Sequence, residues 1–539
     1  MILVRLLIHA ITDLKGQSQY AFLLVTRGVV ERTKIQSLRT LPFYPLLFAI
    51  HPVLALLGSN VNEVDSVVLW RPMAVLAANA FIVMTLLRFL FRDWHRAAIT
   101  TSILLLLFFT YGHIYNYLKT VRMAEFVLGR HRLLMPLWIG LAAFGCWWVT
   151  RKLRNPRLLA PMLNFIAIFL LIYPALQIIS FIWSEDHARK TAEHASQEMA
   201  MQLPLGYAPD IYYLILDGYG REDVLGSVYG YNNSSFLSNL EKMGFYVAKC
   251  SCSNYSQTML SLPSSLNMNY LDELGIELRT GSRNFSALKP LGQENAVRLY
   301  LENHGYHTVS FETNFPVSEW EDADYYLAPP PEGLNNFELL MVGNTAGRVY
   351  LDLFSDPPEE KSATWYRVRT LFALQQLEEK VLAIPGPKFV FAHLVIPHHP
   401  FVFGPNGEPI QPIFYEPSEM EFSMYRKGYI DQVIFINKRI EKLVRMILDG
   451  SSRPPIIIIQ GDHGPAPWGV RENRMYILNA YYFPRGPSGL YESITPVNTF
   501  RLIFNEYFGA NHQLLVDVSR FSKYADPFDF TIMPNSCEY

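Results

Sequence analysis

Five long apolar runs follow one another in the first third of the chain, and this pattern dominates its hydrophobic profile. A helix needs roughly 20 residues to cross the hydrocarbon core of a membrane. Arg88 lies near the end of its run, where its side chain can extend to the interface. We therefore predict a transmembrane domain over residues 40–183, after a cytoplasmic lead-in at 1–39. The expected helices are 40–62, 72–91, 97–118, 133–150 and 158–183.

Polar and apolar residues change their arrangement after this domain. Residues 184–203 are polar and helix-forming, and they predict a helical connector that ends at Pro204. Short β-type runs then alternate with amphipathic stretches at 364–382 and 419–448, which predicts an α/β domain with a mostly parallel sheet. We place this domain at 204–510, followed by a C-terminal extension at 511–539. The expected strands are 211–217, 245–250, 307–312, 388–395, 455–462 and 476–483.

Composition and charge agree with a chain of two parts. Hydrophobic residues make up 50% of the 539 residues and charged residues 17%, which is low for a soluble chain. Residues 1–184 contain 18 Lys and Arg against 6 Asp and Glu, whereas the remainder contains 28 against 42. The basic residues cluster between the apolar runs instead of on a folded face, which argues against nucleic-acid binding.

The basic clusters also predict an orientation, because cytoplasmic loops of membrane proteins are enriched in Lys and Arg. Three segments should be cytoplasmic, although the connection at 119–132 is also basic. Five spans with an internal N-terminus then place the α/β domain outside, as in a multi-pass cell-membrane protein. The cytoplasmic groups are Arg27, Arg32, Lys34 and Arg39; Arg92, His95 and Arg96; and Arg151, Lys152, Arg154 and Arg157.

The cysteines give limited information. Cys146 lies in an apolar run, and the other three lie in the second half, where an oxidising compartment would permit a disulfide. Cys250 and Cys252 are too close in the chain for an easy bridge, so either could pair with Cys537. Their C-x-C spacing lacks the second cysteine pair that would complete a zinc site.

Polar residues follow three of the expected strands. Asp217 follows the first, Asp462 and His463 follow the strand of four isoleucines, and the strand at 388–395 carries His393. Ligands of open parallel sheets bind beyond the carboxyl ends of the strands. Carboxylate and imidazole donors suit a divalent ion such as zinc or manganese. The alternatives are an Asp-Gly turn at Asp217 and a helix-capping role for Asp462.

Thr258 lies in a hydroxyl-rich segment before Pro263, where a helix could start. A threonine at a helix N-terminus lies among backbone N–H donors, and a metal ion beside it would lower the pKa of the hydroxyl enough to make it a nucleophile. The alternative is a capping residue.

Four motifs occur in an order that resembles the sulfatase-like branch of the alkaline phosphatase superfamily. They are LDGYG at Asp217, T-x-x-S-x-P at Thr258, H-x-x-x-x-H-x-P at His393, and GDHG at Asp462. Behind five spans, this layout is similar to lipoteichoic acid synthase and the lipid A phosphoethanolamine transferases over residues 205–510. The resemblance implies an alkaline-phosphatase-like α/β sandwich.

The resemblance also implies roles for individual residues. Asp217, Thr258, Asp462 and His463 would be metal ligands, and Thr258 would also be the nucleophile. His398 would contact the transferred phosphoryl group or a second metal ion. The cofactor would be one or two divalent ions, with zinc or manganese ahead of calcium. The further candidates for substrate binding are His393, His399, Arg471 and Asn473.

The chain departs from the family pattern at three points. Asp217 stands where the membrane transferases usually carry Glu. The next histidine after His463 is His512, too distant in sequence for the additional metal-site histidine of the phosphoethanolamine transferases. Thr258 lacks the Cys or Ser in a C/S-x-P-x-R context that true sulfatases need, which disfavours sulfate-ester cleavage.

These patterns predict a metal-dependent phospho-group transferase. The donor would be a membrane phospholipid that gives up phosphoglycerol or phosphoethanolamine, and the acceptor a cell-envelope glycan or lipid. A phosphodiesterase or phosphatase with water as acceptor is the second possibility, and an inactive glycan- or lipid-binding module is the third. A transporter is disfavoured, because the runs contain few ionisable groups beyond His51 and His113.

Overall fold

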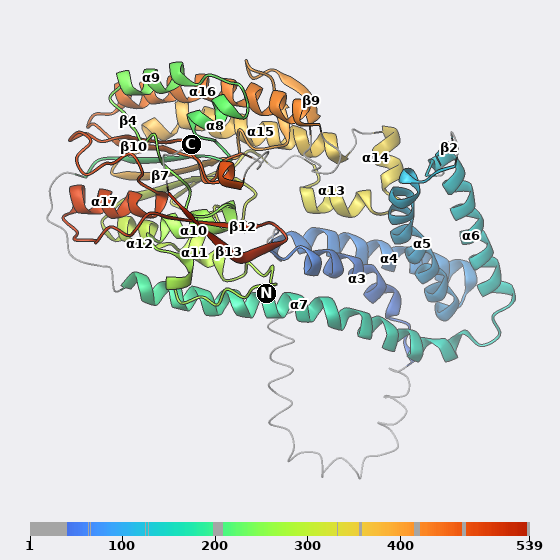
Figure 1. Ribbon diagram of the computed structural model, residues 1–539. Helices are drawn as coiled ribbons and strands as arrows, with labels where there is room; N and C mark the ends of the chain where they lie inside the picture. The colour runs from blue at the N-terminus through green and yellow to red at the C-terminus, as the bar shows by residue number, and fades with distance from the viewer. Residues whose placement is uncertain are drawn as a thin grey trace, which may run out of the picture. The chain divides into compact units, whose positions relative to one another are not determined.

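The computed structural model describes residues 40–62, 64, 66–123, 126–127, 129–197, 208–330, 333–354, 358–413, 421–465 and 471–535. The predicted lead-in at 1–39 and the last part of the connector lie outside these ranges. The chain divides into two compact units. The helical unit comprises 67–176, the described residues up to Ser59, and Leu340–Leu353, whereas the α/β unit takes the rest (Figure 1).

Among the described residues of the helical unit, four helices are long and apolar enough to cross a membrane. The windows with this property run over Val67–Phe91, Trp94–Lys119, His131–Arg151 and Pro156–Asp186. They belong to helices α4 (Trp70–Phe91), α5 (Trp94–Thr120), α6 (His131–Arg151) and α7 (Ala160–Gln197). α7 therefore combines the last predicted span and the described part of the predicted helical connector in one helix.

The first predicted span, 40–62, is shorter in the structure than expected. It forms helix α3 (Tyr44–Ser59), which has 16 residues, fewer than the roughly 20 that a crossing needs. Residues 60–66 belong to the α/β unit. There, Asn62 donates to the Arg283 carbonyl at 3.1 Å and accepts from the Phe285 amide at 3.1 Å. The count of five spans is therefore not confirmed.

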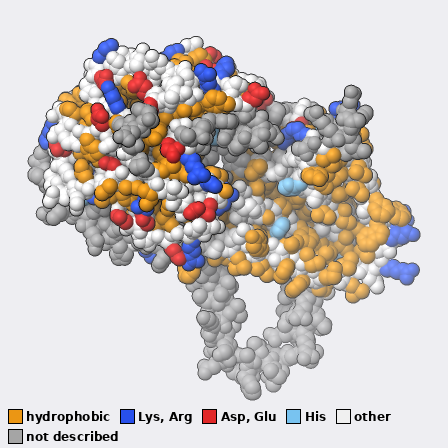
Figure 2. All heavy atoms as spheres, viewed as in Figure 1, with side chains coloured by type: hydrophobic (Ala, Val, Ile, Leu, Met, Phe, Trp, Pro, Cys, Tyr) orange, Lys and Arg blue, Asp and Glu red, His pale blue; other side chains and the backbone are white. Residues whose placement is uncertain are grey.

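The long helices expose apolar side chains in a way that water would not favour. Only 11% of the α4 window and 11% of the α6 window is buried within the structure. Large exposed residues include Phe89, Leu90, Phe144 and Phe169, and Figure 2 shows a nearly continuous hydrophobic surface over these helices. An apolar surface of this extent marks contact with lipid. The chain is a membrane protein with a soluble domain.

Polar contacts fix the helices to one another at their ends. Asp93 caps α5 by accepting from the amides of His95 and Arg96 at 2.8 and 3.2 Å. Arg96 then donates to the carbonyls of Val149 and Thr150 at 2.7 and 2.6 Å, at the end of α6. A cation at a helix C-terminus satisfies carbonyls that have no partner within the helix.

A segment from the second half of the sequence also belongs to the helical unit. It comprises the end of helix α13 (Asn336–Gly343) and most of α14 (Arg348–Phe354). The Ala346 amide donates to the Phe108 carbonyl at 2.8 Å, and Asp352 lies 3.0 Å from His131. This segment, α3, α5 and α7 line an apolar cavity of about 760 Å³.

The α/β unit is built on a seven-stranded mixed sheet with the order β4-β11-β10-β3-β7-β5-β6. The pairings from β10 to β6 are parallel, whereas β11 is antiparallel to both of its neighbours. The strands are β3 (Ile211–Leu216), β4 (Tyr246–Val247), β5 (His307–Phe311), β6 (Tyr325–Leu327), β7 (Lys388–Leu394), β10 (Ile456–Gln460) and β11 (Asn479–Tyr482).

Helices cover both faces of this sheet. Successive side chains along each strand point to opposite faces, so both faces are apolar and need a covering layer. Along β3, Tyr212 and Leu214 join one core, whereas Ile211 and Tyr213 join the other. The first core contains α8 (Glu222–Ser227), α9 (Ser234–Lys242), α15 (Pro358–Glu379) and α16 (Phe422–Gly450). The second contains α10 (Thr258–Leu266), α11 (Leu288–Gln293), α12 (Ala296–Asn303) and α17 (Pro496–Phe508). Figure 1 shows these two sets on opposite sides of the strands.

Each of the six predicted strand segments contains a strand, and α15 and α16 overlap the two predicted helices. The structure adds β6 at one edge and a small hairpin of β8 (Phe401–Phe403) and β9 (Pro409–Ile413). The predicted C-terminal extension contains a second hairpin, β12 (Val518–Lys523) and β13 (Asp526–Pro534). Cys250 is disulfide-bonded, whereas Cys252 is a free buried thiol, and Cys537 lies outside the described residues.

Candidate metal and phosphoryl site

Three adjacent parallel strands deliver the polar residues to one edge of the sheet. β3 lies between β10 and β7, and its register pairs Ile215 with Gln460 on one side and with His393 on the other. Asp217 follows β3 directly, and Asp462 and His463 come two and three residues after the end of β10. The parallel register therefore brings these side chains together, as the sequence pattern predicts.

Thr258 reaches the same place from another direction, as the first residue of helix α10. Its loop is held by contacts with distant parts of the chain. Ser253 donates to the Asp462 carbonyl at 2.5 Å, and Ser256 donates to the Ser522 carbonyl of β12 at 2.9 Å. The C-terminal hairpin thus braces the loop that presents Thr258.

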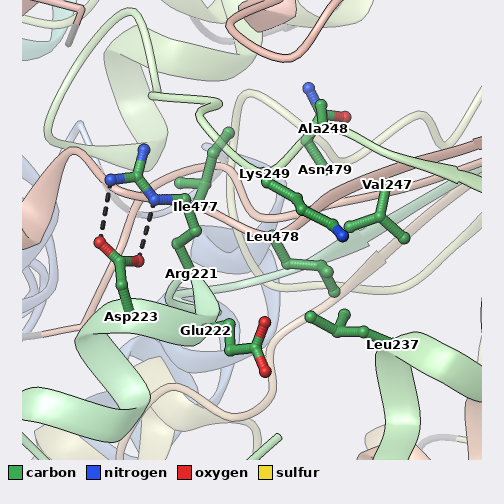
Figure 3. A pocket seen from close by; sticks show the side chains of 10 residues that line it. All are labelled: Arg221, Glu222, Asp223, Leu237, Val247, Ala248, Lys249, Ile477, Leu478 and Asn479. Atoms are coloured by element: carbon green, nitrogen blue, oxygen red, sulfur yellow. Dashed lines mark hydrogen bonds and ion pairs between the residues drawn. The ribbon is translucent and has the colours of Figure 1, made fainter. Parts of the chain in front are cut away.

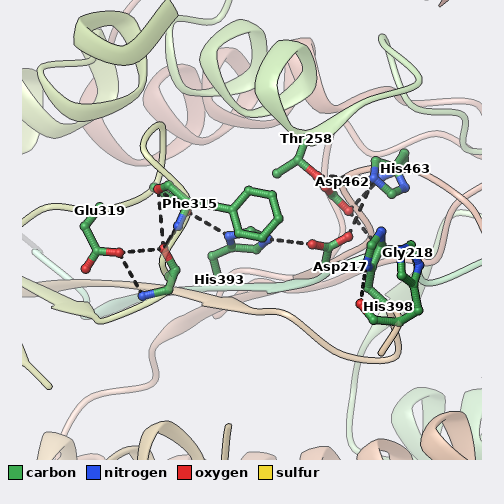
Figure 4. A network of polar contacts seen from close by, with 12 residues as sticks. Asp217, Gly218, Thr258, Phe315, Glu319, His393, His398, Asp462 and His463 are labelled. Carbon is green, nitrogen blue, oxygen red and sulfur yellow. Dashed lines mark hydrogen bonds and ion pairs between the residues drawn. The ribbon is translucent and has the colours of Figure 1, made fainter. Parts of the chain in front are cut away.

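The side chains form one buried cluster (Figure 4). The Nε2 atom of His463 lies 3.2 Å from the Thr258 hydroxyl and 3.6 Å from both Asp217 Oδ1 and Asp462 Oδ2. His393 Nε2 lies 3.4 Å from Asp217 Oδ2. Asp217 is fully buried and Asp462 is 2% exposed. Two carboxylates this deeply buried are costly without a compensating cation.

Unpartnered polar atoms test whether a cation fits this cluster. Within the described residues, four buried atoms of the cluster have no hydrogen-bond partner: both carboxylate oxygens of Asp217, Asp462 Oδ2 and His393 Nε2. Buried polar groups normally have partners. Oxygen and imidazole nitrogen are the donors that zinc and manganese accept. The residues therefore fit a divalent ion.

Two overlapping sets of potential ligand atoms exist in the cluster. Asp217, His398 and His463 form one, and Asp217, His393 and Asp462 form the other; the atoms of each set lie within 4.8 Å of one another. Asp217 belongs to both sets, so it would be a shared ligand whichever set held an ion.

The protonation states suit metal binding. Burial opposes ionisation of Asp217, but the positive charge of His398 and the contact with His393 outweigh it and hold the pKa of this carboxyl well below its ordinary value. Burial and the charge of Arg474 hold the pKa of His463 well below its ordinary value. At neutral pH the site thus contains an anionic aspartate and a neutral imidazole, as metal ligands require. Burial and the charge of Asp217 raise the pKa of Asp462.

Neighbouring groups orient the ligands. His463 Nδ1 lies 2.9 Å from the Gly464 carbonyl, so this nitrogen carries the proton and Nε2 keeps its lone pair for the cluster. Ser318 lies 2.8 Å from His393 Nδ1 and fixes that ring in turn. The Gly218 amide donates to Asp462 Oδ1 at 3.0 Å, and Gly218 itself has a φ of +72°, in the region that favours glycine.

The structure brings together Asp217, Thr258, His393, His398, Asp462 and His463. His399 stacks on His398 with ring centres 4.0 Å apart; burial and the charge of His398 lower its pKa to about 2. Arg471 is exposed, and its guanidinium lies over Phe521. Asn473 is buried beside Gly464, whose added Cβ would meet the Asn473 carbonyl oxygen at 2.4 Å.

Sequence reasoning missed Arg474, which contacts His463 directly at 3.1 Å. The only signal for it was its nearness to the GDHG motif, and the same signal pointed equally to Arg471 and Asn473. Sequence reasoning also missed Ser318, because it lies 75 residues before His393 and no local motif surrounds it.

A separate hollow of about 310 Å³ lies near the β4 and β11 edge of the sheet (Figure 3). Its most buried cation, Arg221, already forms a forked ion pair with Asp223, with both contacts at 2.9 Å. The metal-ligand cluster does not line this hollow.

Neither a family model nor a curated protein sequence matches the chain. Among solved structures, the periplasmic domain of EptC from Escherichia coli is 13% identical, with a TM-score of 0.37, over 60% of this chain and 92% of that one. The same domain has been solved in complex with Zn. Lipooligosaccharide phosphoethanolamine transferase A from Neisseria meningitidis is 11% identical, with a TM-score of 0.36, over 86% and 94%.

A third similar structure is BT1596, a 2-O GAG sulfatase, which is 14% identical, with a TM-score of 0.36, over 59% of this chain and 74% of that one. These similar structures thus include a phosphoethanolamine transferase and a sulfatase. At these values no residue's role is carried over, so the chemistry has to be argued from the side chains.

Proposed function

We propose that this protein is a membrane-anchored, metal-dependent enzyme that transfers the phospho-head group of a phospholipid through Thr258. One observation carries the proposal: a threonine hydroxyl lies 3.2 Å from an imidazole nitrogen in a buried cluster with two aspartates that have unpartnered oxygens. Asp217, Thr258, Asp462 and His463 would hold the ion. When bound, a divalent ion supplies charge stabilisation and lowers the pKa of the threonine hydroxyl.

Two displacements complete the proposed reaction. In the first, Thr258 Oγ gives up its hydroxyl proton and forms a bond to phosphorus while the bond from phosphorus to the diacylglycerol oxygen breaks, and the leaving oxygen takes up a proton. In the second, a hydroxyl of an envelope glycan or lipid loses its proton and attacks phosphorus, while the bond from phosphorus to Thr258 Oγ breaks and Thr258 Oγ takes up a proton. His398 would contact the phosphoryl oxygens, because one of its ring nitrogens lies within 4.8 Å of ligand atoms of Asp217 and His463.

The helical unit supports a lipid donor. It embeds the protein in the phase that contains phospholipids, so the donor is at a high local concentration. Its cavity of about 760 Å³ lies among membrane-spanning helices and is lined mostly by apolar side chains, a composition that suits an acyl chain.

The charge pattern of two connections between the long helices favours an outward position for the α/β unit, although a third connection, at 119–132, is also basic. Basic residues are concentrated at 92–96 and again at 151–157, which favours a cytoplasmic position for both. One long helix, α7, then separates the second cluster from the α/β unit. The unit would therefore lie outside the cytoplasm whether or not the short helix α3 crosses the membrane.

The test compares Thr258→Ala with Thr364→Ala, a control threonine exposed on α15. The full chain in detergent is given vesicles of labelled phosphatidylethanolamine or phosphatidylglycerol, with and without glycan acceptors. We expect Thr258→Ala to abolish head-group release and the control to retain it. Mass spectrometry of the peptide containing Thr258 should show an adduct whose mass identifies the group. Full activity of Thr258→Ala would exclude the proposed nucleophile.

A further inference from the structure

Arg474 is the one cation among the described residues with a side-chain contact of less than 3.5 Å to His463 Nε2, the nitrogen that Thr258, Asp217 and Asp462 surround. It ends the short helix η7 (Arg471–Arg474) and donates through all three of its side-chain nitrogens. Nε donates to the Ser256 carbonyl at 2.9 Å, and Nη1 donates to the Gly464 carbonyl at 3.2 Å. Nη2 lies 3.1 Å from His463 Nε2. The guanidinium thus joins the loop before Thr258 to the loop after His463.

The third contact differs from the other two. Because His463 Nδ1 carries the proton, Nε2 has a single lone pair, and this lone pair faces Arg474 Nη2, the Thr258 hydroxyl and the two aspartates. A lone pair engaged by a cation cannot also accept from a guanidinium. Nη2 then needs another acceptor, whereas Nε and Nη1 keep their carbonyl partners and hold the side chain in place.

Geometry limits where that acceptor can lie. Thr258 Oγ1 and Arg474 Nη2 each lie within 3.2 Å of the same nitrogen, so they are separated by at most 6.4 Å, twice that distance. The oxygens of a phosphoryl group on Thr258 would lie within this space. Guanidinium stays protonated at all relevant pH values and binds phosphate oxygens strongly.

We propose that Arg474 binds the non-bridging oxygens of the phosphoryl group as it passes through Thr258, an inference that rests on the proposed function. No proton moves from Arg474. Its Nη2–H donates to an oxygen that gains negative charge while the new P–O bond to Thr258 forms and the bond to the leaving oxygen breaks. A fixed donor aimed at developing charge stabilises a transition state more than a ground state.

Arg474 also joins two loops, so its substitution could lower activity by disturbing the structure alone. The experiment has to distinguish this structural role from phosphoryl binding. The test therefore uses Arg474→Gln and Arg474→Lys in the full chain, with Arg485→Gln as a control at an exposed arginine of the same unit. Four quantities are measured: metal content, kcat and KM for head-group release, and affinity for inorganic phosphate by calorimetry. Melting curves check that each variant is folded.

For Arg474→Gln we expect unchanged metal content, a fall in kcat of about 10²- to 10³-fold with little change in KM, and at least about tenfold weaker phosphate binding. Arg474→Lys, which keeps the charge, should recover part of the loss, and Arg485→Gln should match the wild type. Wild-type kcat and phosphate affinity in Arg474→Gln would overturn the assignment. So would activity lost in step with metal content or folding. An active Thr258→Ala variant would instead overturn the proposed function, so the two failures are distinguishable.

Discussion

Replacement of Asp462 by Asn gives the sharpest test of the proposed metal ligands. Relative to the wild type, we expect the variant to be more stable without metal and less stable with metal bound. Asp462 Oδ1 accepts from the amides of Gly218 and His463 at 3.0 and 2.9 Å, and an asparagine oxygen can keep both bonds. Oδ2 has no hydrogen-bond partner among the described residues and faces the shared nitrogen of His463. The substitution therefore removes one negative charge with little change in shape.

The structure sets the size of the effect. Asp217 Oδ1 and Asp462 Oδ2 each lie 3.6 Å from His463 Nε2, so they are at most 7.2 Å apart, twice that distance. Two unit charges at this separation repel by about 2 kcal/mol or more at an effective dielectric constant of about 20. Metal-free Asp462→Asn should thus unfold at a higher temperature than the metal-free wild type at pH 8, by a few degrees.

The sign of the pH dependence follows from the raised pKa of Asp462. A carboxyl whose folded pKa lies above its unfolded value destabilises the folded state as pH rises through that window, and has no such effect below the unfolded pKa. The higher unfolding temperature of metal-free Asp462→Asn relative to the metal-free wild type should therefore vanish near pH 3.5. Added zinc or manganese should stabilise the wild type by about 2.7 kcal/mol at 100 times its Kd, and the variant much less.

The assay is thermal melting of the full chain after dialysis against a chelator, repeated with each metal at three pH values. A metal-free variant less stable than the wild type at pH 8 would refute the argument from charge repulsion. Equal stabilisation of both proteins by metal would remove Asp462 from the ligand set.

Two further predictions concern the surroundings of the cluster. Gly218→Ala should destabilise the protein by about 1–2 kcal/mol in melting experiments, because Gly218 has a φ of +72°, whereas Gly226→Ala, inside α8 with no atom within 4 Å of the added Cβ, should be neutral or stabilising. Burial and the charges of Glu319 and Glu321 raise the pKa of Glu312 above 4.5, so Glu312→Gln should melt higher than the wild type at pH 8 and equally at pH 3.5. A stable Gly218→Ala, or a Gln variant with no pH-dependent difference, would contradict these two arguments.

Local patterns predicted the parts of the structure that local physics decides. Runs such as the four isoleucines at 456–459 favour a strand buried on both faces, and a parallel register then places Asp217 beside Asp462 and His463. The residues of the four motifs could therefore be predicted to lie together from the sequence alone. The long spans could be read for the same reason, since they are continuous in sequence.

The features that sequence did not reveal depend on contacts between distant segments. The C-terminal hairpin braces the Thr258 loop through Ser256 and Ser522, which are 266 residues apart. Arg471 and Arg474 stand at the two ends of one short helix, yet Arg474 contacts His463 whereas Arg471 is exposed and lies over Phe521. The first span ends at Ser59 in the structure, and three residues later Asn62 bonds to Arg283 and Phe285, 221 and 223 residues away. No pattern within a window of 20 residues contains such information.

The negative charge of the cluster should both destabilise the metal-free protein and allow the cluster to bind the cation that activates Thr258. A threonine hydroxyl in neutral surroundings is a weak nucleophile, and it becomes a useful one only beside a cation. Holding a cation deep in the fold requires buried anions, and Asp217 and Asp462 would provide them at the expense of stability in the metal-free protein. Arg474 adds positive charge at the rim, on the side of Thr258, where a phosphoryl group would bring negative charge. A variant that makes the metal-free fold more stable by removing an anion should therefore be a poorer enzyme, and this inverse relation should distinguish ligands of the ion from residues that only pack around it.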